Sequence, residues 1–460
     1  MEQCFKILSP CGILGYGFPT DSFERGLAEH PDAIVVDAGS TDAGPHKLGA
    51  NVAIVSRTAC KKDLLRLIEG GNRLGIPVII GSAGGSGGKS HVQWTLSIID
   101  EIFAENDLKP MKQAVIWADI PKDEIRYRLR RGEVTPLGAA VPPLTEQALD
   151  ETNGVVAQMG IEPVLKALEG GAQLIICGRA YDPAPFAAAG VHAGYDPALC
   201  YHLGKVLECG ALCCEPGTTK DCIIGALYKD HFEVYPTNPI RHCNHVSVAA
   251  HTFYEKSHPY ILLGPGIVMN LADCTFTDCE NGRVAVRGSK MAASDRYYIK
   301  LEGARRCAYR TFVIAGVRDP LLIAQIEQVE ELVRESVAEQ YSDISQDRYK
   351  VNFVNYGKNG VMGALEPETA PAHELGVLFE VVAETQEIAS AICSSLRSTF
   401  MHYGYPGRKS TAGNLAFPFA PSDVEFGAVY EFSLYHLMPV DDPCALFPIE
   451  YSMRGGAQNG

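Results

Sequence analysis

The sequence predicts an α/β protein with a doubly wound, mostly parallel sheet in an N-terminal domain and an α+β C-terminal domain that holds a ferredoxin-like βαββαβ element. Over roughly the first 200 residues, short β-branched runs alternate with helical stretches, and each run ends in a loop rich in Gly, Asp or Pro. After residue 220 the strands become longer and amphipathic. Because 460 residues exceed what one core usually organises, we place two domains at residues 1–220 and 221–460.

The N-terminal runs are short and apolar, as expected for strands buried on both faces of a parallel sheet. They are residues 5–8, 33–37, 77–80, 114–119 and 174–177. Helices with apolar residues at three- and four-residue spacing lie at 61–74, 91–105 and 162–169. Right-handed crossovers would bring every strand-end loop to the carboxyl edge of the sheet.

The last third of the chain has the order strand, helix, strand, strand, helix, strand. Its elements are expected at residues 307–317, 320–340, 349–356, 375–383, 384–401 and 427–435. This βαββαβ order is the split βαβ of ferredoxin-like domains.

Composition excludes several classes of partner. The net charge of −15 opposes a general attraction to nucleic acid or anionic lipid. The N-terminus does not resemble a secretion signal, and no apolar run is long enough to span a bilayer, so we expect a cytoplasmic protein. We also expect it to form oligomers.

The 15 cysteines are scattered and odd in number, which favours reduced thiols over a disulfide scaffold. Cys209, Cys213 and Cys214 lie close together, but no second well-spaced pair follows. Buried free thiols are therefore the favoured interpretation, ahead of a zinc or iron–sulfur site.

The first chemically rich loop spans residues 37–46 (DAGSTDAGPH), where glycines let the backbone approach a ligand. Ser40 is a candidate anion binder, while Asp42 and His46 can share acid/base work at four-residue spacing. The alternative is a turn whose polar side chains only cap the next helix.

The second loop, residues 81–90 (GSAGGSGGKS), joins an apolar strand to an amphipathic helix, so its N–H groups and the helix dipole predict an anion cradle. Its candidate anion-binding residues are Gly81, Ser82, Gly84, Gly85, Gly87 and the following His91. The loop also fits a loose phosphate-loop pattern, in which Lys89 and Ser90 would contact phosphate and Mg²⁺. Asp119 would then be the acid on the metal side, or else merely a helix cap.

Two further groups complete the candidates. In the loop at 177–185, Arg179 can bind a carboxylate and Asp182 can orient it or act as a base, unless the two form a structural ion pair. His251 and Glu255 lie on one face of an expected helix in the second domain, where they suit acid/base chemistry in a cleft above the first domain. A structural hydrogen bond is the alternative.

Several of these segments together resemble the acyclic terpene utilisation family, AtuA. The similar stretches are residues 37–49, 81–88, 177–183, 204–210, 247–256, 301–304 and 411–421. The resemblance implies a catabolic role beside enzymes that process branched or unsaturated acids and their CoA esters, and a small ferredoxin-like partner that can be a separate polypeptide. The family pattern needs the glycines and His91 but not Lys89 and Ser90, which weakens the phosphate-loop interpretation.

We therefore expect a hydro-lyase or isomerase that acts on a small carboxylic acid or its CoA ester. The glycine loop and Arg179 would hold the anion, while Asp42, His46, Asp182, His251 and Glu255 would move protons. No redox cofactor is implied, and a divalent metal is left open at Asp119. The alternatives are a nucleotide-dependent enzyme and a non-catalytic subunit that supports a partner enzyme.

Overall fold

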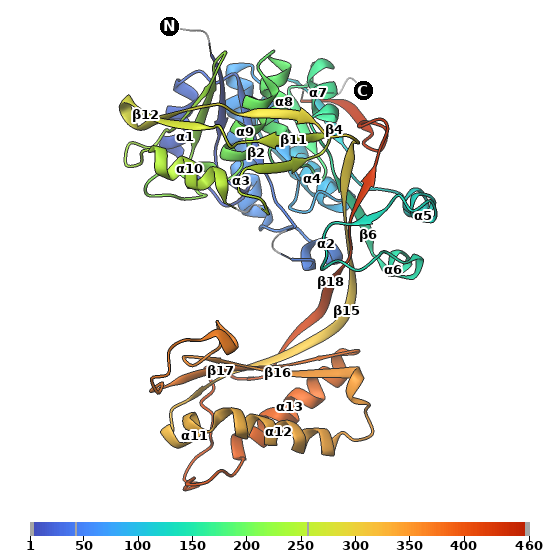
Figure 1. Ribbon diagram of the computed structural model, residues 1–460, viewed down its shortest axis with the longest axis vertical. Coiled ribbons are helices and arrows are strands. Elements are labelled where there is room, and N and C mark those ends of the chain that lie inside the picture. Colours follow the sequence, from blue (N-terminus) through green and yellow to red (C-terminus); the bar gives the residue numbers. More distant parts are fainter. Residues whose placement is uncertain (1–3, 42–43, 255–256, 456–460) are drawn as a thin grey trace. The chain divides into compact units, whose positions relative to one another are not determined.

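A computed structural model describes residues 4–41, 44–254 and 257–455 of the chain. The chain forms two compact units, one of Met1–Arg305 with Phe432–Gly460 and the other of Arg306–Glu431 (Figure 1). This division differs from the predicted boundary at residue 220. The reason is that strands after residue 220 extend the N-terminal sheet, and the chain returns to the first unit at its end.

Five parallel strands form the centre of the first unit, and they are the five predicted runs. They are β1 (Phe5–Ser9), β2 (Ala33–Asp37), β3 (Val78–Gly81), β7 (Leu174–Cys177) and β4 (Met111–Ile116), in that order across the sheet. Every neighbouring pair among them is parallel. Their carboxyl ends therefore lie at one edge of the sheet.

Antiparallel strands extend this core on both sides, so the described residues form a mixed ten-stranded sheet. The added strands are β8 (Ile223–Leu227), β9 (Phe232–Pro236), β13 (Arg283–Arg287), β12 (Thr275–Cys279) and β19 (Ile449–Arg454). Strand β8 pairs with β1, and β19 pairs with β4. The expectation of a mostly parallel sheet holds for the five central strands. The antiparallel strands on either side cover both edges of this parallel core.

Helices cover both faces of the sheet, as the doubly wound prediction requires. The helices α1 (Thr20–Ala28), α3 (Arg57–Leu74) and α4 (Lys89–Glu105) share one apolar core with alternate strand residues such as Ile34 and Val36. The helices α7 (Glu162–Glu169), α8 (Ala184–His192) and α9 (Pro197–Leu207) share the opposite core with Ala33 and Val35. The alternation follows from the two-residue period of a strand.

The remaining elements of the first unit are shorter. Between β2 and β7 the chain adds α2 (His46–Ala50), α5 (Lys122–Arg130), β5 (Thr135–Pro136), α6 (Glu146–Glu151) and β6 (Gly154–Gln158). After β7 come a 3-10 turn, η1 (Gly210–Cys213), the helix α10 (His245–Phe253) and a small sheet of β10 (Ile261–Gly264), β11 (Ile267–Asn270) and β14 (Lys290–Ala293). Helix α10 contacts both α9 and η1.

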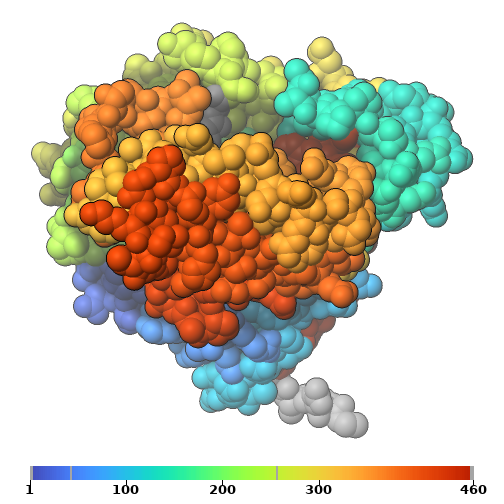
Figure 2. Space-filling model, turned by 90° about the horizontal axis from the view of Figure 1, so that it is seen from below, coloured from blue at the N-terminus to red at the C-terminus, as the bar shows by residue number. Residues whose placement is uncertain are grey.

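The second unit has the predicted βαββαβ order. Its elements are β15 (Tyr298–Val317), α11 (Pro320–Ala324), α12 (Ile326–Gln340), β16 (Tyr349–Tyr356), β17 (Leu375–Ala383), α13 (Gln386–His402) and β18 (Val424–Pro439). Strand β17 pairs antiparallel with β15 and with β16, so it splits a βαβ crossover. Helices α12 and α13 lie side by side on one face of this sheet (Figure 1), and Figure 2 shows the surface of this unit in orange. The long strands β15 and β18 begin or end in the first unit.

No helix within the described residues combines the length and the apolar character that a membrane crossing needs.

The loops after β2, β3 and β7 pack tightly against one another at the carboxyl edge. The amide of Arg179 donates to the carbonyl of Gly87 at 3.1 Å. A Cβ on Gly87 would lie 2.1 Å from the Arg179 nitrogen, and a Cβ on Gly39 would lie 2.3 Å from the Cα of Gly85. The predicted meeting of the three loops is therefore present, and glycine is needed where the backbones touch.

Replacing Gly87 by alanine tests how much of the stability depends on this close approach. Gly87 and Gly75 have similar φ angles, +65° and +71°, but a Cβ on Gly75 would meet nothing within 4 Å. Gly75→Ala should therefore lower the free energy of unfolding by about 1–2 kcal/mol, because alanine is strained in the left-handed conformation. Gly87→Ala should cost roughly 1–3 kcal/mol more, because the Arg179 backbone must move. Urea unfolding measures both free energies, and equal losses would contradict the packing role.

Candidate functional site

The loop after β7 lines a polar cavity of about 430 Å³ in the first unit. Its walls come from four places in the sequence: the end of β6, the loop after β7, the end of α9, and residues between 263 and 300. The lining residues are Gln158, Arg179, Tyr181, Asp182, Pro183, Lys205, Glu208, Leu263 and Lys300. Strongly polar side chains thus meet at the carboxyl edge of the parallel sheet.

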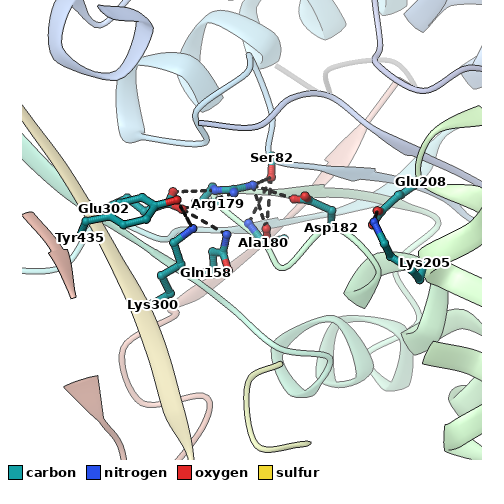
Figure 3. Close-up of polar contacts among 10 residues, drawn as sticks. All are labelled: Ser82, Gln158, Arg179, Ala180, Asp182, Lys205, Glu208, Lys300, Glu302 and Tyr435. Atoms are coloured by element: carbon teal, nitrogen blue, oxygen red, sulfur yellow. Dashed lines mark hydrogen bonds and ion pairs between the residues drawn. The ribbon is translucent and has the colours of Figure 1, made fainter. Parts of the chain in front are cut away.

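Arg179 lies at the centre of this site and is almost fully buried (Figure 3). Its Nε donates to Oε2 of Glu302 at 2.8 Å, and its Nη1 donates to Oδ1 of Asp182 at 2.8 Å and to Oγ of Ser82 at 3.0 Å. Most of the guanidinium donors are therefore used within the protein. This geometry supports the structural ion-pair interpretation of Arg179, in which the guanidinium positions Asp182.

Glu302 lies on β15 with no exposed surface, and two cations compensate its charge. Besides Arg179, the Nζ of Lys300 lies 2.9 Å from its Oε1, and the Gln158 amide donates to the same oxygen at 3.2 Å. Burial alone would raise the pKa of Glu302, but the attraction of Arg179 and Lys300 is stronger and lowers it below its ordinary value. Glu302 is therefore ionised, and it fixes both cations.

Asp182 is the charged group of the cavity that solvent reaches most easily. Its side chain is 28% exposed, compared with 1% for Arg179, 8% for Lys205 and 17% for Lys300. Figure 3 shows Asp182 between Arg179 and the pair formed by Lys205 and Glu208. A ligand that enters the cavity would therefore meet the Asp182 carboxyl group.

Lys205 and Glu208 form a second buried ion pair, with 2.5 Å between Nζ and Oε1. The ammonium also lies 4.3 Å from the ring centroid of Tyr254. Burial would lower the pKa of Lys205, but the Glu208 carboxylate raises it above its ordinary value, so the lysine stays charged. The pair places a fixed positive charge near Asp182 on the side opposite Arg179.

Two further acids lie near these ions. Burial, followed by repulsion from Asp182, raises the pKa of Asp37 well above its ordinary value. Its Oδ1 has no hydrogen-bond partner among the described residues. The Tyr181 hydroxyl is also buried without such a partner in the described part of the chain, and burial raises its pKa. Burial thus opposes the ionisation of both groups.

A second cavity, of about 480 Å³, adjoins the polar one. The two cavities share Gln158, Tyr181, Leu263 and Lys300. The walls of the second cavity are largely apolar and include Leu137, Leu263, Pro265, Ile267, Val268 and Leu437. Together the cavities can hold a ligand with a charged end and an apolar chain.

The comparison with protein families matches residues 62–224 and 239–422 to the model described as acyclic terpene utilisation family protein AtuA. The chain belongs to this family. The comparisons with curated proteins and with solved structures found no match. The matched AtuA segments contain every residue that lines the polar cavity, whereas the loop at 37–46 precedes them.

The glycine loop of this AtuA chain has a different place from the one predicted. Gly81, Ser82, Gly84, Gly85 and Gly87 are all buried, and none of them lines the polar cavity or the apolar cavity beside it. A Cβ on Gly84 would lie 2.7 Å from the His91 carbonyl oxygen, so this loop is packed against its own helix. Ser82, at a left-handed φ of 46°, supports Arg179 instead.

The carboxyl group of Asp119 lies at the N-terminus of α4. The backbone amide of Lys89 donates to Oδ1 of Asp119 at 3.1 Å, which is where a phosphate-loop helix would bind phosphate. His91 is buried, and its Nε2 lies 3.1 Å from the carbonyl oxygen of Val52. Asp119 and His91 thus hold the helix and its neighbouring loop, and the helix-cap interpretation of Asp119 is the one that the contacts support.

Two further predicted residues, Ser40 and His46, do not lie at the polar cavity. Both are half-buried and line neither that cavity nor the apolar one beside it. Burial, followed by the charge of Lys47, lowers the pKa of His46. Asp42 and Glu255 lie outside the described residues. Among the predicted candidates that the structure describes, only Arg179 and Asp182 line the polar cavity.

His251 lies in the first unit, on a helix that packs against α9. The expectation that it reaches into a cleft from a second domain is therefore wrong, because α10 belongs to the same compact unit as the sheet. Its ring stacks on Tyr254 with 4.8 Å between centroids. Burial, with a contribution from Lys205, lowers its pKa to about 4.

Sequence reasoning missed five residues of the site: Tyr181, Lys205, Glu208, Lys300 and Glu302. A signal was present for some of them. Lys300 and Glu302 are charged residues two positions apart in a strand whose intervening residues, Ile299 and Leu301, lie on the opposite face and are apolar and buried. Charges at that spacing lie on one strand face and are unusual unless they are paired.

The depressed pKa of His251 makes a prediction about acid stability. The unfolded imidazole binds a proton near pH 6.5, whereas the folded one does so only near pH 4, so the unfolded state holds more protons between these values. The contribution of neutral His251 to the free energy of unfolding is complete above pH 6.5. It is lost as the pH falls toward 4, and the full loss is about 3 kcal/mol.

The measurement is the free energy of unfolding from pH 7.5 to 4.5. His251→Phe keeps the stacked ring and should lose less stability than the unaltered protein over that range. His402→Phe, at an exposed position, is the control and should follow the unaltered protein. Identical pH profiles for all three proteins would rule out a buried neutral His251.

Proposed function

We propose that this AtuA family protein is a hydro-lyase or isomerase that acts on a carboxylic acid, or its CoA ester, with a branched or unsaturated apolar chain. Family membership supports a role in acyclic terpene utilisation. The observation that carries the finer proposal is the position of Asp182, an accessible carboxyl group between two buried cations in a polar cavity that shares residues with an apolar one.

Lys300 and Tyr181 are suited to hold the polar end of such a substrate, because both line the two cavities at their junction. The Lys300 ammonium is fixed by Glu302 and by the Tyr435 hydroxyl at 2.6 Å. The Tyr181 hydroxyl has no other hydrogen-bond partner among the described residues. A carboxylate or a thioester carbonyl placed here would receive two hydrogen bonds while its chain occupied the apolar cavity.

Asp182 is then placed to move the proton. Its carboxylate takes a proton from the carbon next to the substrate carbonyl, and Lys300 and Tyr181 stabilise the negative charge that develops on the carbonyl oxygen. The protonated Asp182 exchanges its proton with solvent and then delivers a proton to the product. Delivery to another carbon completes an isomerisation, whereas delivery to a departing hydroxide releases water and leaves a double bond. Arg179 acts as a positioning residue for Asp182.

Two features oppose the nucleotide-dependent alternative with Lys89, Ser90 and Asp119. The glycines of the loop are buried, and the Asp119 carboxyl group accepts a hydrogen bond from the backbone amide of Lys89 at the start of α4. Lys89 itself is exposed, so Lys89→Ala is a suitable control variant.

Binding is the first step to test, with 3-methylcrotonyl-CoA, 3-methylcrotonate and ATP with Mg²⁺ as probes in a thermal-shift titration. We expect the unaltered protein and Lys89→Ala to be stabilised by the acyl-CoA or the acid. Lys300→Met should weaken that binding by roughly 10- to 100-fold, the loss of one charge-assisted hydrogen bond. Stabilisation by ATP that Lys89→Ala abolishes would instead support the nucleotide-dependent enzyme.

Proton transfer is the second step, measured as loss of the enoyl absorbance and as deuterium uptake from D₂O by NMR. Asp182→Asn keeps the size of the side chain but removes the base, so kcat should fall by about 10²- to 10⁴-fold while probe binding persists. Tight binding by the unaltered protein without any deuterium uptake would support the non-catalytic subunit.

A further inference from the structure

Three cysteines meet in the first unit at a place that the proposed function does not use. Cys213 and Cys214 end and follow η1, and Cys243 precedes α10. Their Sγ atoms all lie within 4.8 Å of one another, and each residue is no more than 3% exposed. Sequence spacing drew attention to Cys213 and Cys214 but could not reveal Cys243, which joins them only in the fold.

Backbone hydrogen bonds hold the two segments in register. Glu215 and His242 form an antiparallel bridge, in which the Glu215 amide donates to the His242 carbonyl at 2.8 Å and the reverse bond measures 3.1 Å. Cys214 and Cys243 are therefore directly opposite each other, at the closer, non-hydrogen-bonded position of the ladder. Their Sγ atoms are 3.5 Å apart.

We propose that Cys213, Cys214 and Cys243 bind one thiophilic metal ion, Zn²⁺ or Cu⁺, through three thiolates. Thiolate sulfur is the ligand type that selects these ions. Two sulfurs bound to one zinc at about 2.3 Å lie roughly 3.8 Å apart, close to the separation already present between Cys214 and Cys243. On binding, each thiol releases its proton and each sulfur donates an electron pair, with no change of oxidation state.

The surroundings favour this arrangement of negative charge. The Arg241 guanidinium is close enough to Cys214 to favour negative charge on its sulfur. Arg241 is fixed by the buried Asp221, whose Oδ2 lies 2.7 Å from its Nε.

Within the described residues no further His, Cys, Asp or Glu joins the three sulfurs. A Cu⁺ ion needs no other ligand, whereas a Zn²⁺ ion would take its fourth ligand from solution. A Cys214–Cys243 disulfide is the competing use of the pair. It would leave Cys213 without a role and would require the two sulfurs to approach to about 2.05 Å.

The metal would tie together two segments of the first unit, one of which follows the α9 residues that line the polar cavity. The chain on one side runs back into the end of α9, which carries Lys205 and Glu208, and on the other side it runs into α10, which carries His251. Metal binding should therefore stabilise the first unit even without substrate.

The experiment uses the full chain, purified under reducing conditions and stripped with a chelator. Zn²⁺ is titrated against a chromophoric chelator, and Cu⁺ is titrated against bathocuproine disulfonate in a separate anaerobic arm. We expect one equivalent of at least one ion to bind and to raise Tm. Cys243→Ser and Cys214→Ser should weaken that binding by more than about 100-fold. Cys200→Ser, a buried cysteine outside the cluster, should bind like the unaltered protein.

Because a variant can fail to fold, the unaltered protein is also alkylated with and without the ion and analysed by mass spectrometry. Protection of Cys213, Cys214 and Cys243 alone, with Cys200 unaffected, supports the site. The proposal is overturned if neither ion binds stoichiometrically, if binding survives in Cys214→Ser and Cys243→Ser, or if the reduced protein regains a Cys214–Cys243 disulfide instead of binding metal.

Discussion

The buried ion pair between Arg179 and Glu302 is the contact on which the candidate site depends. Neither side chain has more than 1% of its surface exposed, so each charge is far from solvent. Isolated charges at such a depth cost several kcal/mol each, and a buried pair is tolerated only when hydrogen bonds satisfy both partners. Ser82, Asp182, Gln158 and Lys300 supply those bonds. Loss of either charge would therefore leave the other uncompensated and would release Asp182 and Lys300 together.

This pair also explains why the site needs two kinds of strand. The loop after β7 comes from the parallel core, where the neighbouring strands β3 and β7 bring Gly87 and Arg179 into backbone contact. The counter-charge comes from β15, which pairs antiparallel with β6 and carries Lys300 and Glu302 past the same edge. The parallel core thus provides closely packed strand-end loops, and the long strand provides the charges that orient Arg179. The glycines that were predicted to bind an anion instead allow these loops to pack against each other.

Local patterns were enough to predict the strands of the parallel core and the βαββαβ order, because burial and periodicity are written in consecutive residues. Pairings across long separations were not predictable in this way. Glu302 is 123 residues from Arg179, and its partner is not evident from either segment alone. The glycine loop shows a second limit, since the same composition suits phosphate binding and close backbone packing. The burial of the loop and the contact between Asp119 and the Lys89 amide favour the packing role.

The two aspartates near Arg179 lie in different surroundings, although the same cation acts on both. Asp182 is partly exposed and accepts a hydrogen bond from the guanidinium. Asp37 is buried, repelled by Asp182, and held by Arg179 only at longer range, so its pKa rises well above the ordinary value. Carboxyl groups whose environments push their pKa values apart are a common arrangement for acid and base roles. Ionisation of Asp37 would add negative charge near Asp182, and this repulsion acts together with burial to raise the pKa of Asp37.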